Sequence, residues 1–358
     1  MSLKEITKEH FGKTSDGKDV YVFILRAGGV TVRVLNFGCV VKEILVPDKD
    51  GNITDICLGH DTFEGYEDNP AFLGAICGRV ANRIDGATFE LDGKRYDVSK
   101  NDPLGNNLCH GGFVGFTRRC FDWKIDGFKL ILTYTDVDGA EGFPGDVDVT
   151  VTYELTSDAE FMMDYQATTN KATPIDMANH FMVNLAGHDH GYVGDHIVTS
   201  NSSEILEFNE RFIPTGKILS VEGSLFDFRK PVLLGDVLER MPGKDGLHHS
   251  HLVQGHDGQK RLVARAEHKN TGRYLEVWST EPQFVAYSCF YLDFLLKGTP
   301  CKAGHVYQKS GGILFMPHKY PNAVNVASFP SVVVRPGETY HASSSYKFGV
   351  TRTCDVIS

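Results

Sequence analysis

The sequence has no long hydrophobic run, no excess of basic residues and no paired-cysteine motif. Because no stretch of about 18 apolar residues occurs, no helix is expected to span a membrane. Lys and Arg total 36 against 46 Asp and Glu, and the net charge of −10 disfavours binding to a nucleic-acid backbone. The start of the chain, MSLKEITKE, is too charged for a secretory signal. These absences predict a cytoplasmic protein that binds neither nucleic acid nor membrane.

The eight cysteines have irregular spacing, and no two of them form a CxxC pair. Several lie in apolar runs, such as Cys77 after Ile76 and Cys289 before Phe290. We therefore expect buried free thiols rather than disulfides, as in a reducing compartment.

A long amphipathic helix is also absent, and short β-type segments take its place. In the segment 147–155, Val147, Val149, Val151 and Tyr153 alternate with polar residues, which is typical of a half-buried strand. Asp92-Gly93 predicts the turn of a hairpin over 87–96. Further strands are expected at 20–25, 30–35, 130–135, 161–168, 177–185, 261–266, 274–279, 284–291 and 331–335, and one short helical turn at 237–240. With no strand–helix alternation, linker or repeat, we expect an all-β fold: a large antiparallel β-sandwich forming a single domain over 1–358.

Three polar clusters are candidates for a functional site. His180 lies in the apolar segment 177–185, His110 precedes two glycines, and two arginines and Asn82 lie in the segment 78–84. Histidine suits proton transfer because its pKa lies near neutral pH. Together with arginine and asparagine donors, these histidines indicate a site for a neutral polyol.

Each cluster also has a purely structural interpretation. His180 can be a core histidine bonded to the backbone, and His110 a turn residue. Arg79 and Arg83 can be surface charges paired with Asp85 or Asp92.

Eight motifs follow one another along the chain: GRVANRI (78–84), LCHGGFVGF (108–116), EGFPG (141–145), ANHFMVNL (178–185), FDFRKP (226–231), TEP (280–282), YPNAVN (320–325) and RPGE (335–338). In this order they resemble the aldose 1-epimerase family, also called the galactose mutarotases, over nearly the whole length. The resemblance implies a many-stranded antiparallel supersandwich without a cofactor. It also implies a free aldose such as galactose or glucose as the small-molecule partner, whose α and β anomers are interconverted, and a monomer or weak dimer.

The resemblance assigns roles to individual residues. His180 looks like the general acid at the sugar ring oxygen, and His110 like the second histidine, which hydrogen-bonds the sugar. Asn82 and Arg83 resemble the polar pair that holds sugar hydroxyls, and Glu281 falls where the family has a Glu or Gln near the site.

The sequence departs from the family pattern at two positions. His248 stands where the family has an aspartate that binds sugar hydroxyls. Met316 stands five residues before Pro321, where the catalytic glutamate is expected, and a thioether cannot accept a proton. Neutral His248 and Glu281 are then the candidate proton acceptors.

Two other function classes follow from these departures and from the histidine content. A non-catalytic sugar-binding protein would keep the pocket and lose the base. A metal-binding protein is indicated by the histidine tracts, which are expected in loops: 188, 190 and 196, then 248, 249, 251 and 256. Neither tract has the spacing of a known zinc motif, so we expect no metal site.

Overall fold

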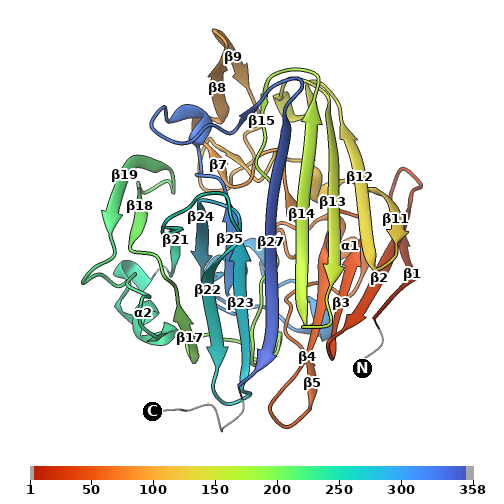
Figure 1. Ribbon diagram of the computed structural model, residues 1–358, viewed down its shortest axis with the longest axis vertical. Coiled ribbons are helices and arrows are strands. Elements are labelled where there is room, and N and C mark those ends of the chain that lie inside the picture. The colour runs from red at the N-terminus through yellow and green to blue at the C-terminus, as the bar shows by residue number, and fades with distance from the viewer. Residues whose placement is uncertain (1–3, 245, 352–358) are drawn as a thin grey trace.

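Strands dominate the computed structural model, which describes residues 4–244 and 246–351 (Figure 1). One antiparallel sheet of nine strands runs through the molecule in the order β11 (Asp122–Asp126), β12 (Lys129–Asp136), β13 (Val147–Leu155), β14 (Glu160–Thr169), β27 (Thr339–Val350), β23 (Arg273–Ser279), β22 (Arg261–His268), β17 (His196–Thr199) and β20 (Val232–Leu233). The expected all-β, antiparallel fold class is confirmed.

Two five-stranded sheets pack on this large sheet. The first has the order β1 (Glu5–Lys13), β2 (Asp19–Ala27), β3 (Val30–Leu35), β4 (Val41–Pro47) and β5 (Ile53–Asp55). The second has the order β19 (Pro214–Ser220), β18 (Glu204–Phe208), β21 (His248–Leu252), β24 (Gln283–Tyr287) and β25 (Leu314–His318). A single hydrophobic cluster takes side chains from all three sheets, so the nine-stranded sheet shares its core with both.

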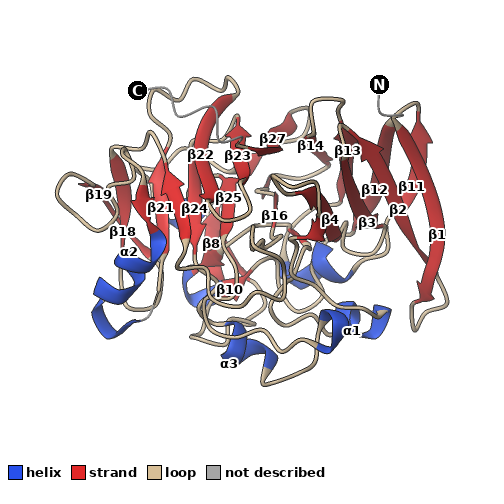
Figure 2. Cartoon of the chain, turned by 90° about the horizontal axis from the view of Figure 1, so that it is seen from below, coloured by secondary structure: helices blue, strands red, loops and turns tan. Residues whose placement is uncertain are grey.

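Short elements complete the fold. The α-helices of the described residues are α1 (Phe63–Glu67), α2 (Leu234–Arg240) and α3 (Leu292–Leu296), and α1 and α3 lie on the loop-rich side of the sheets in Figure 2. The hairpin β8 (Thr88–Leu91) and β9 (Lys94–Asp97) projects at the top of Figure 1, with its turn at Asp92-Gly93 as predicted. Two-residue strands form the remaining pairs: β6 (Ile76–Cys77) with β16 (Ala178–Asn179), β7 (Arg83–Ile84) with β10 (Leu108–Cys109), and β15 (Thr173–Pro174) with β26 (Val333–Val334).

The period of two in the sequence explains the buried faces. In β13 the residues Val147, Val149, Val151 and Tyr153 are buried, whereas Asp148 is exposed and the polar residues after it are half-buried. Alternate side chains of a strand point to opposite faces of its sheet, so this pattern places the apolar set in the core.

Several expectations from the sequence are wrong in detail. The segment 177–185 is a strand only in β16, and 331–335 is a strand only in β26. The strand expected over 284–291 ends at Tyr287, because the chain turns at Cys289, whose φ is 52°. His248, His249 and His251 lie in the regular strand β21 rather than in a loop, because β24 pairs with them residue by residue.

The seven cysteines within the described residues are free thiols, and all except Cys120 are buried. Cys354 lies outside the described residues. None of the helices in the described part of the chain has the length and apolar character needed to cross a bilayer.

Candidate functional site

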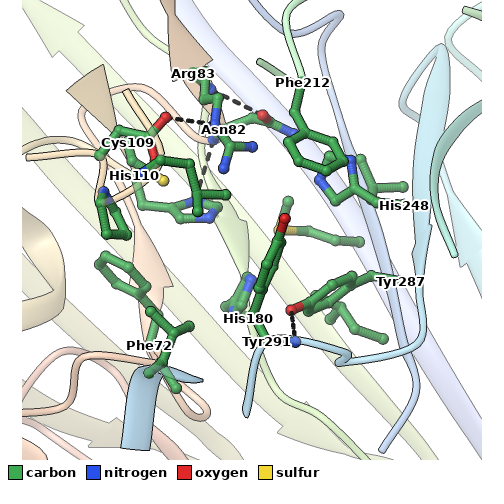
Figure 3. A pocket seen from close by; sticks show the side chains of 18 of the residues that line it. Phe72, Asn82, Arg83, Cys109, His110, His180, Phe212, His248, Tyr287 and Tyr291 are labelled. Carbon is green, nitrogen blue, oxygen red and sulfur yellow. Dashed lines mark hydrogen bonds and ion pairs between the residues drawn. The ribbon is translucent and has the colours of Figure 1, made fainter. Parts of the chain in front are cut away.

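A cavity opens on the loop-rich side of the second five-stranded sheet and gathers residues from distant parts of the chain (Figure 3). It is lined by Pro70, Ala71, Phe72, Asn82, Arg83, Asp102, Pro103, Leu104, Cys109, His110, His180, Met182, Phe212, His248, Val285, Tyr287, Tyr291, Phe294, Leu295, Leu314 and Met316. Six of the seven residues singled out from the sequence are among them, and Glu281 is not.

Strand alternation builds the floor of this cavity. On β25 the side chains of Leu314 and Met316 line the cavity, whereas Phe315 between them packs into the main core. On β24 Val285 and Tyr287 line the cavity in the same way. In both strands, the residues on one face therefore pack in the core and the residues on the other face line the cavity.

His180 is placed by backbone pairing with the segment 74–77. β16 pairs with β6, and the His180 N–H donates to the Ala75 carbonyl at 2.8 Å. Asn179, beside it, is structural: its Nδ2 donates to the Tyr153 hydroxyl at 3.2 Å, and its Oδ1 accepts the Phe181 N–H at 2.9 Å. His180 is 7% exposed, and its Nδ1 has no hydrogen-bond partner.

His110 lies against His180, with ring centroids 4.8 Å apart. Its backbone has a φ of 48°, and its Nδ1 accepts the Asn82 N–H at 3.2 Å. Because Nδ1 is an acceptor, the proton of the neutral ring is on Nε2. His110 can therefore donate a hydrogen bond from Nε2 into the cavity.

Arg83 is held by a buried carboxylate that no sequence motif had indicated. Its Nε donates to Asp102 Oδ2 at 2.7 Å, and Asn107 Nδ2 donates to the same oxygen at 3.1 Å. Within the described residues, Nε is the only nitrogen of the Arg83 guanidinium with a hydrogen-bond partner. The two terminal amino groups of Arg83 remain available to a ligand.

The pairing of these arginines with Asp85 or Asp92 is wrong. Arg79 is 1% exposed and donates through Nε and Nη2 to Asp136 Oδ2, at 3.0 and 2.7 Å. Asp85 and Asp92 instead pair with Arg211 and Arg335 at the surface. Arg79 does not line the cavity, because its guanidinium is turned into the β12 side of the fold, where buried charge needs a partner.

His248 begins β21 opposite Tyr287, and aromatic rings surround it. Its ring centroid lies 5.0 Å from that of Phe212 and 5.7 Å from that of Tyr287. Its Nδ1 is buried without a partner. Met316 pairs with Val285 across the sheet and is 2% exposed, so no proton acceptor replaces the missing glutamate at this position.

Burial keeps the histidines of the cavity neutral. Burial lowers the pKa of His180 to about 4. It also lowers the pKa of His110 and of His248 well below the usual value, with neighbouring His180 adding to the effect at His110 and Arg83 adding to it at His248. At neutral pH these side chains are therefore neutral imidazoles, each able to donate one hydrogen bond and accept another.

Glu281 lies outside the cavity. It is 1% exposed, its N–H donates to Ser279 Oγ, and its carboxylate pairs with Lys319 Nζ at 3.2 Å. Burial raises its pKa. A carboxylate held by a lysine in this way is not in position to contact a ligand in the cavity.

A second buried pair lies behind Met316. His318 is two residues further along β25, and its Nδ1 is 2.9 Å from Asp176 Oδ2. Both side chains are buried, and His318 Nε2 has no hydrogen-bond partner. His318 does not line the cavity, although it lies on the same face of β25 as Met316.

The aromatic and acidic parts of the cavity were not predicted from the sequence: Phe72, Asp102, Phe212, Tyr287, Tyr291 and Phe294. Of these, only Asp102 carried a usable signal, because it lies in a polar loop just before the His110 motif. The aromatic residues come from separate loops and strands, and nothing local in the sequence distinguishes them from core residues.

The chain matches known proteins along nearly its whole length. The profile of the aldose 1-epimerase family matches residues 21–347. The chain is 37% identical to the galactose mutarotase of Bos taurus, with 97% of this chain and 100% of that protein covered. It is 31% identical to the aldose 1-epimerase of Escherichia coli strain K12, with 93% and 96% covered.

Solved structures agree with these sequence matches. An aldose epimerase homologue from C. elegans has a TM-score of 0.83 at 26% identity, covering 98% of this chain and 100% of the other. A galactose 1-epimerase from Lactobacillus acidophilus has the same TM-score at 23% identity, with 98% and 100% covered, and supports the fold. The supersandwich expected from the sequence is thereby confirmed. The chain therefore belongs to the aldose 1-epimerase family of isomerases.

Proposed function

We propose that the protein interconverts the α and β anomers of a free hexose such as galactose or glucose, at a slow rate. The observation that carries this proposal is that His180, which is buried, and His248, which is half-buried, line one cavity and that each has a buried Nδ1 without a hydrogen-bond partner. An unpaired buried polar atom costs roughly 1–3 kcal/mol, which a bound polyol would recover by hydrogen bonding.

The proposed reaction needs only two proton transfers. The C1 hydroxyl loses a proton to a base while the ring oxygen is protonated by an acid, so the C1–O bond to the ring breaks and an aldehyde forms. Rotation about C1–C2 and closure in the reverse sense give the other anomer. We assign the ring oxygen to His180 and the sugar hydroxyls to His110, Asn82 and Arg83.

His248 is the proposed proton acceptor in place of a carboxylate at position 316. It is neutral at pH 7, it lines the cavity, and its Nδ1 is unpartnered. Glu281 is paired with Lys319 outside the cavity, and Asp102, the one carboxylate among the described lining residues, is held by Arg83 and Asn107.

The proposed slowness has a physical reason. With a pKa of about 4, His180 is an imidazolium in roughly one molecule in 10³ at pH 7. Its neutral form can only polarise the ring oxygen by donating a hydrogen bond. Both proton transfers are therefore slow, because neutral His180 is a weak acid and His248, with its lowered pKa, is a weak base.

Anomer exchange followed by NMR on freshly dissolved α-galactose and α-glucose tests the proposal. The wild type should accelerate exchange above the spontaneous rate, and His180→Asn should lose ~10²–10⁴ of the protein-dependent part, which is the contribution of a general acid. His249→Asn is the matched control, since its ring packs against Phe226 and does not line the cavity. An unchanged rate in His180→Asn would remove His180 from the reaction.

Two further variants identify the acceptor. His248→Asn should lower the rate if His248 takes the C1 proton, while His318→Gln should leave it unchanged. Loss of rate in His318→Gln alone would transfer the role to the Asp176–His318 pair, reached through a water molecule.

The second candidate function is a sugar-binding protein without catalysis. Met316 favours it, since the position holds no proton acceptor. Two results together would establish this alternative: saturation transfer from the protein to the NMR signals of a sugar at millimolar concentration, and anomer exchange at the spontaneous rate.

A further inference from the structure

Three potential metal ligands meet outside the cavity. His190 and Asp195 lie in the loop before β17, and His268 ends β22. Asp195 Oδ2 is 2.9 Å from His268 Nε2 and 3.4 Å from His190 Nε2. The three ligand atoms all lie within 4.8 Å of one another, and none of the three residues lines the cavity.

His196 orients the carboxylate of this cluster. His196 is fully buried, and its Nε2 accepts the Leu185 N–H at 2.9 Å. The neutral ring therefore has its proton on Nδ1, which lies 3.0 Å from Asp195 Oδ1 and donates to it. With Oδ1 held in this way, Oδ2 is directed at the other two histidines.

Thr271 orients His268. Its Oγ1 lies 2.9 Å from His268 Nδ1 and 3.4 Å from the Leu185 carbonyl. In the metal-free protein the neutral ring of His268 can carry its proton on Nε2 and donate it to Asp195 Oδ2, while the Thr271 hydroxyl donates to Nδ1. A metal ion bound at Nε2 would replace that proton. The proton of the neutral ring would then be on Nδ1, which donates to Thr271 Oγ1.

We propose that His190, Asp195 and His268 form a binding site for a borderline divalent cation of the Zn²⁺ class. Zinc takes imidazole and carboxylate ligands at about 2.0–2.2 Å in a tetrahedron, so its ligand atoms lie roughly 3.3 Å apart. Two of the pairs are already at 2.9 and 3.4 Å. The side chain of His190 is 47% exposed, so it can move to complete the site, and water takes the fourth position. Two imidazole ligands favour zinc over Mg²⁺ or Ca²⁺.

The hydrogen bonds around the three proposed ligands are those found around metal ligands in other proteins. Metal-bound histidines usually donate their second ring nitrogen to an oxygen, as His268 can to Thr271, and bound carboxylates are themselves hydrogen-bonded, as Asp195 is by His196. A bound ion would fasten the loop between Leu185 and β17 to the end of β22. The tract of histidines in this loop could not reveal the site, because His188 is turned to the Tyr307 hydroxyl and the third ligand comes from another strand.

Titration of the purified full-length protein with ZnCl₂, by calorimetry and by metal analysis after dialysis, tests the proposal. The wild type should bind one equivalent and show a higher unfolding temperature with zinc than with EDTA. His190→Ala should bind at least ~tenfold more weakly, and Thr271→Val roughly 10–100-fold more weakly, as for other groups that support a ligand. Because His190 is half exposed, its removal should leave the unfolding temperature in EDTA unchanged.

His341→Ala is the matched control. His341 also forms an exposed ion pair, with its Nε2 2.6 Å from Asp164 Oδ2, but the pair lacks a second imidazole. Zinc affinity in this variant should equal that of the wild type. The proposal is overturned if the wild type shows no saturable binding, or if His190→Ala binds as tightly as His341→Ala.

Substitution of Co²⁺ for zinc reports the ligands directly. The expected spectrum has visible d–d bands of a tetrahedral site and no thiolate charge-transfer band. A thiolate band would show that zinc binds at a cysteine instead, which also overturns the proposal.

Discussion

Replacing Met316 by glutamate should convert a slow isomerase into a faster one. Glutamate has nearly the length of methionine, so it can occupy the same position on β25, with its carboxylate in the cavity. His180, His248 and Arg83 line the same cavity. The substitution adds a proton acceptor, and it also places a negative charge among neutral imidazoles.

The expected gain has two sources. A positioned general base contributes ~10²–10⁴-fold. An opposite charge within about 4–6 Å shifts a pKa by 1–3 units, so a carboxylate would raise the pKa of His180 from about 4 toward neutral and increase its imidazolium fraction. Burial opposes both effects, because it raises the pKa of the new carboxyl and keeps part of it protonated. We therefore expect an increase of at least ~tenfold at pH 7, about 1.4 kcal/mol in the barrier, and a larger one when His248→Asp is added.

The measurement is the protein-dependent rate of anomer exchange as a function of pH. The wild-type rate should rise as pH falls from 7 toward 5, because the imidazolium form of His180 increases. The Met316→Glu rate should instead pass through a maximum, limited by ionisation of the glutamate on the acid side. Met316→Gln is the control, since it has the same shape and no base, and it should stay at the wild-type rate.

Equal rates in the glutamate and glutamine variants, with sugar binding intact in both, would refute this reasoning. So would a wild type as fast as a family member that carries the glutamate. In the second case His248, or the Asp176–His318 pair, must already supply efficient base catalysis.

Three further predictions concern stability and redox state. His251 is fully buried, with both ring nitrogens unpartnered and its ring stacked between Phe228 and Phe284; His251→Phe should raise the free energy of unfolding by ~1–3 kcal/mol in urea titrations at pH 7.5. Burial lowers the pKa of His251 to about 3 in the native state. Below pH 6.5, therefore, His251 binds a proton in the unfolded wild type and stays neutral in the native state. The advantage of the variant should accordingly widen by up to ~1.4 kcal/mol per pH unit as pH falls below 6.5, and a constant gap would contradict this. Arg79→Met leaves Asp136 buried without its partner and should cost ~3–5 kcal/mol in the same assay, whereas a loss below ~1 kcal/mol would show that the pair is dispensable. Alkylation of the unfolded chain without reductant should add eight labels by intact mass, and fewer labels would contradict a reducing cytoplasmic location.

The strands were predictable because their signal is local. The segment 147–155, predicted from its alternation, coincides with β13. Asp92-Gly93 correctly predicts the turn of the β8–β9 hairpin. Both depend on neighbouring residues alone: one face of a strand must be buried, and a tight turn needs particular backbone angles. By contrast, 177–185 is as apolar as a strand but forms one for only two residues, because bridges to separate segments replace a continuous partner.

The sequence by itself determined which residue types are available to the site. It placed His110, His180 and the 78–84 cluster as candidates, and it showed that positions 248 and 316 lack carboxylates. The identity of a side chain fixes whether it can accept a proton, and no fold can change that for methionine.

Only the tertiary structure decided which of these groups meet and in what state. It joined Arg83 to Asp102, turned Arg79 away to Asp136 and left Glu281 with Lys319 outside the cavity. It also brought His268 to His190 and Asp195 from a different strand. Burial, which depends on every layer of the fold, set the histidines of the cavity to their neutral form. Pairing and desolvation act through space between residues far apart in the chain, so no local pattern of amino acids contains them.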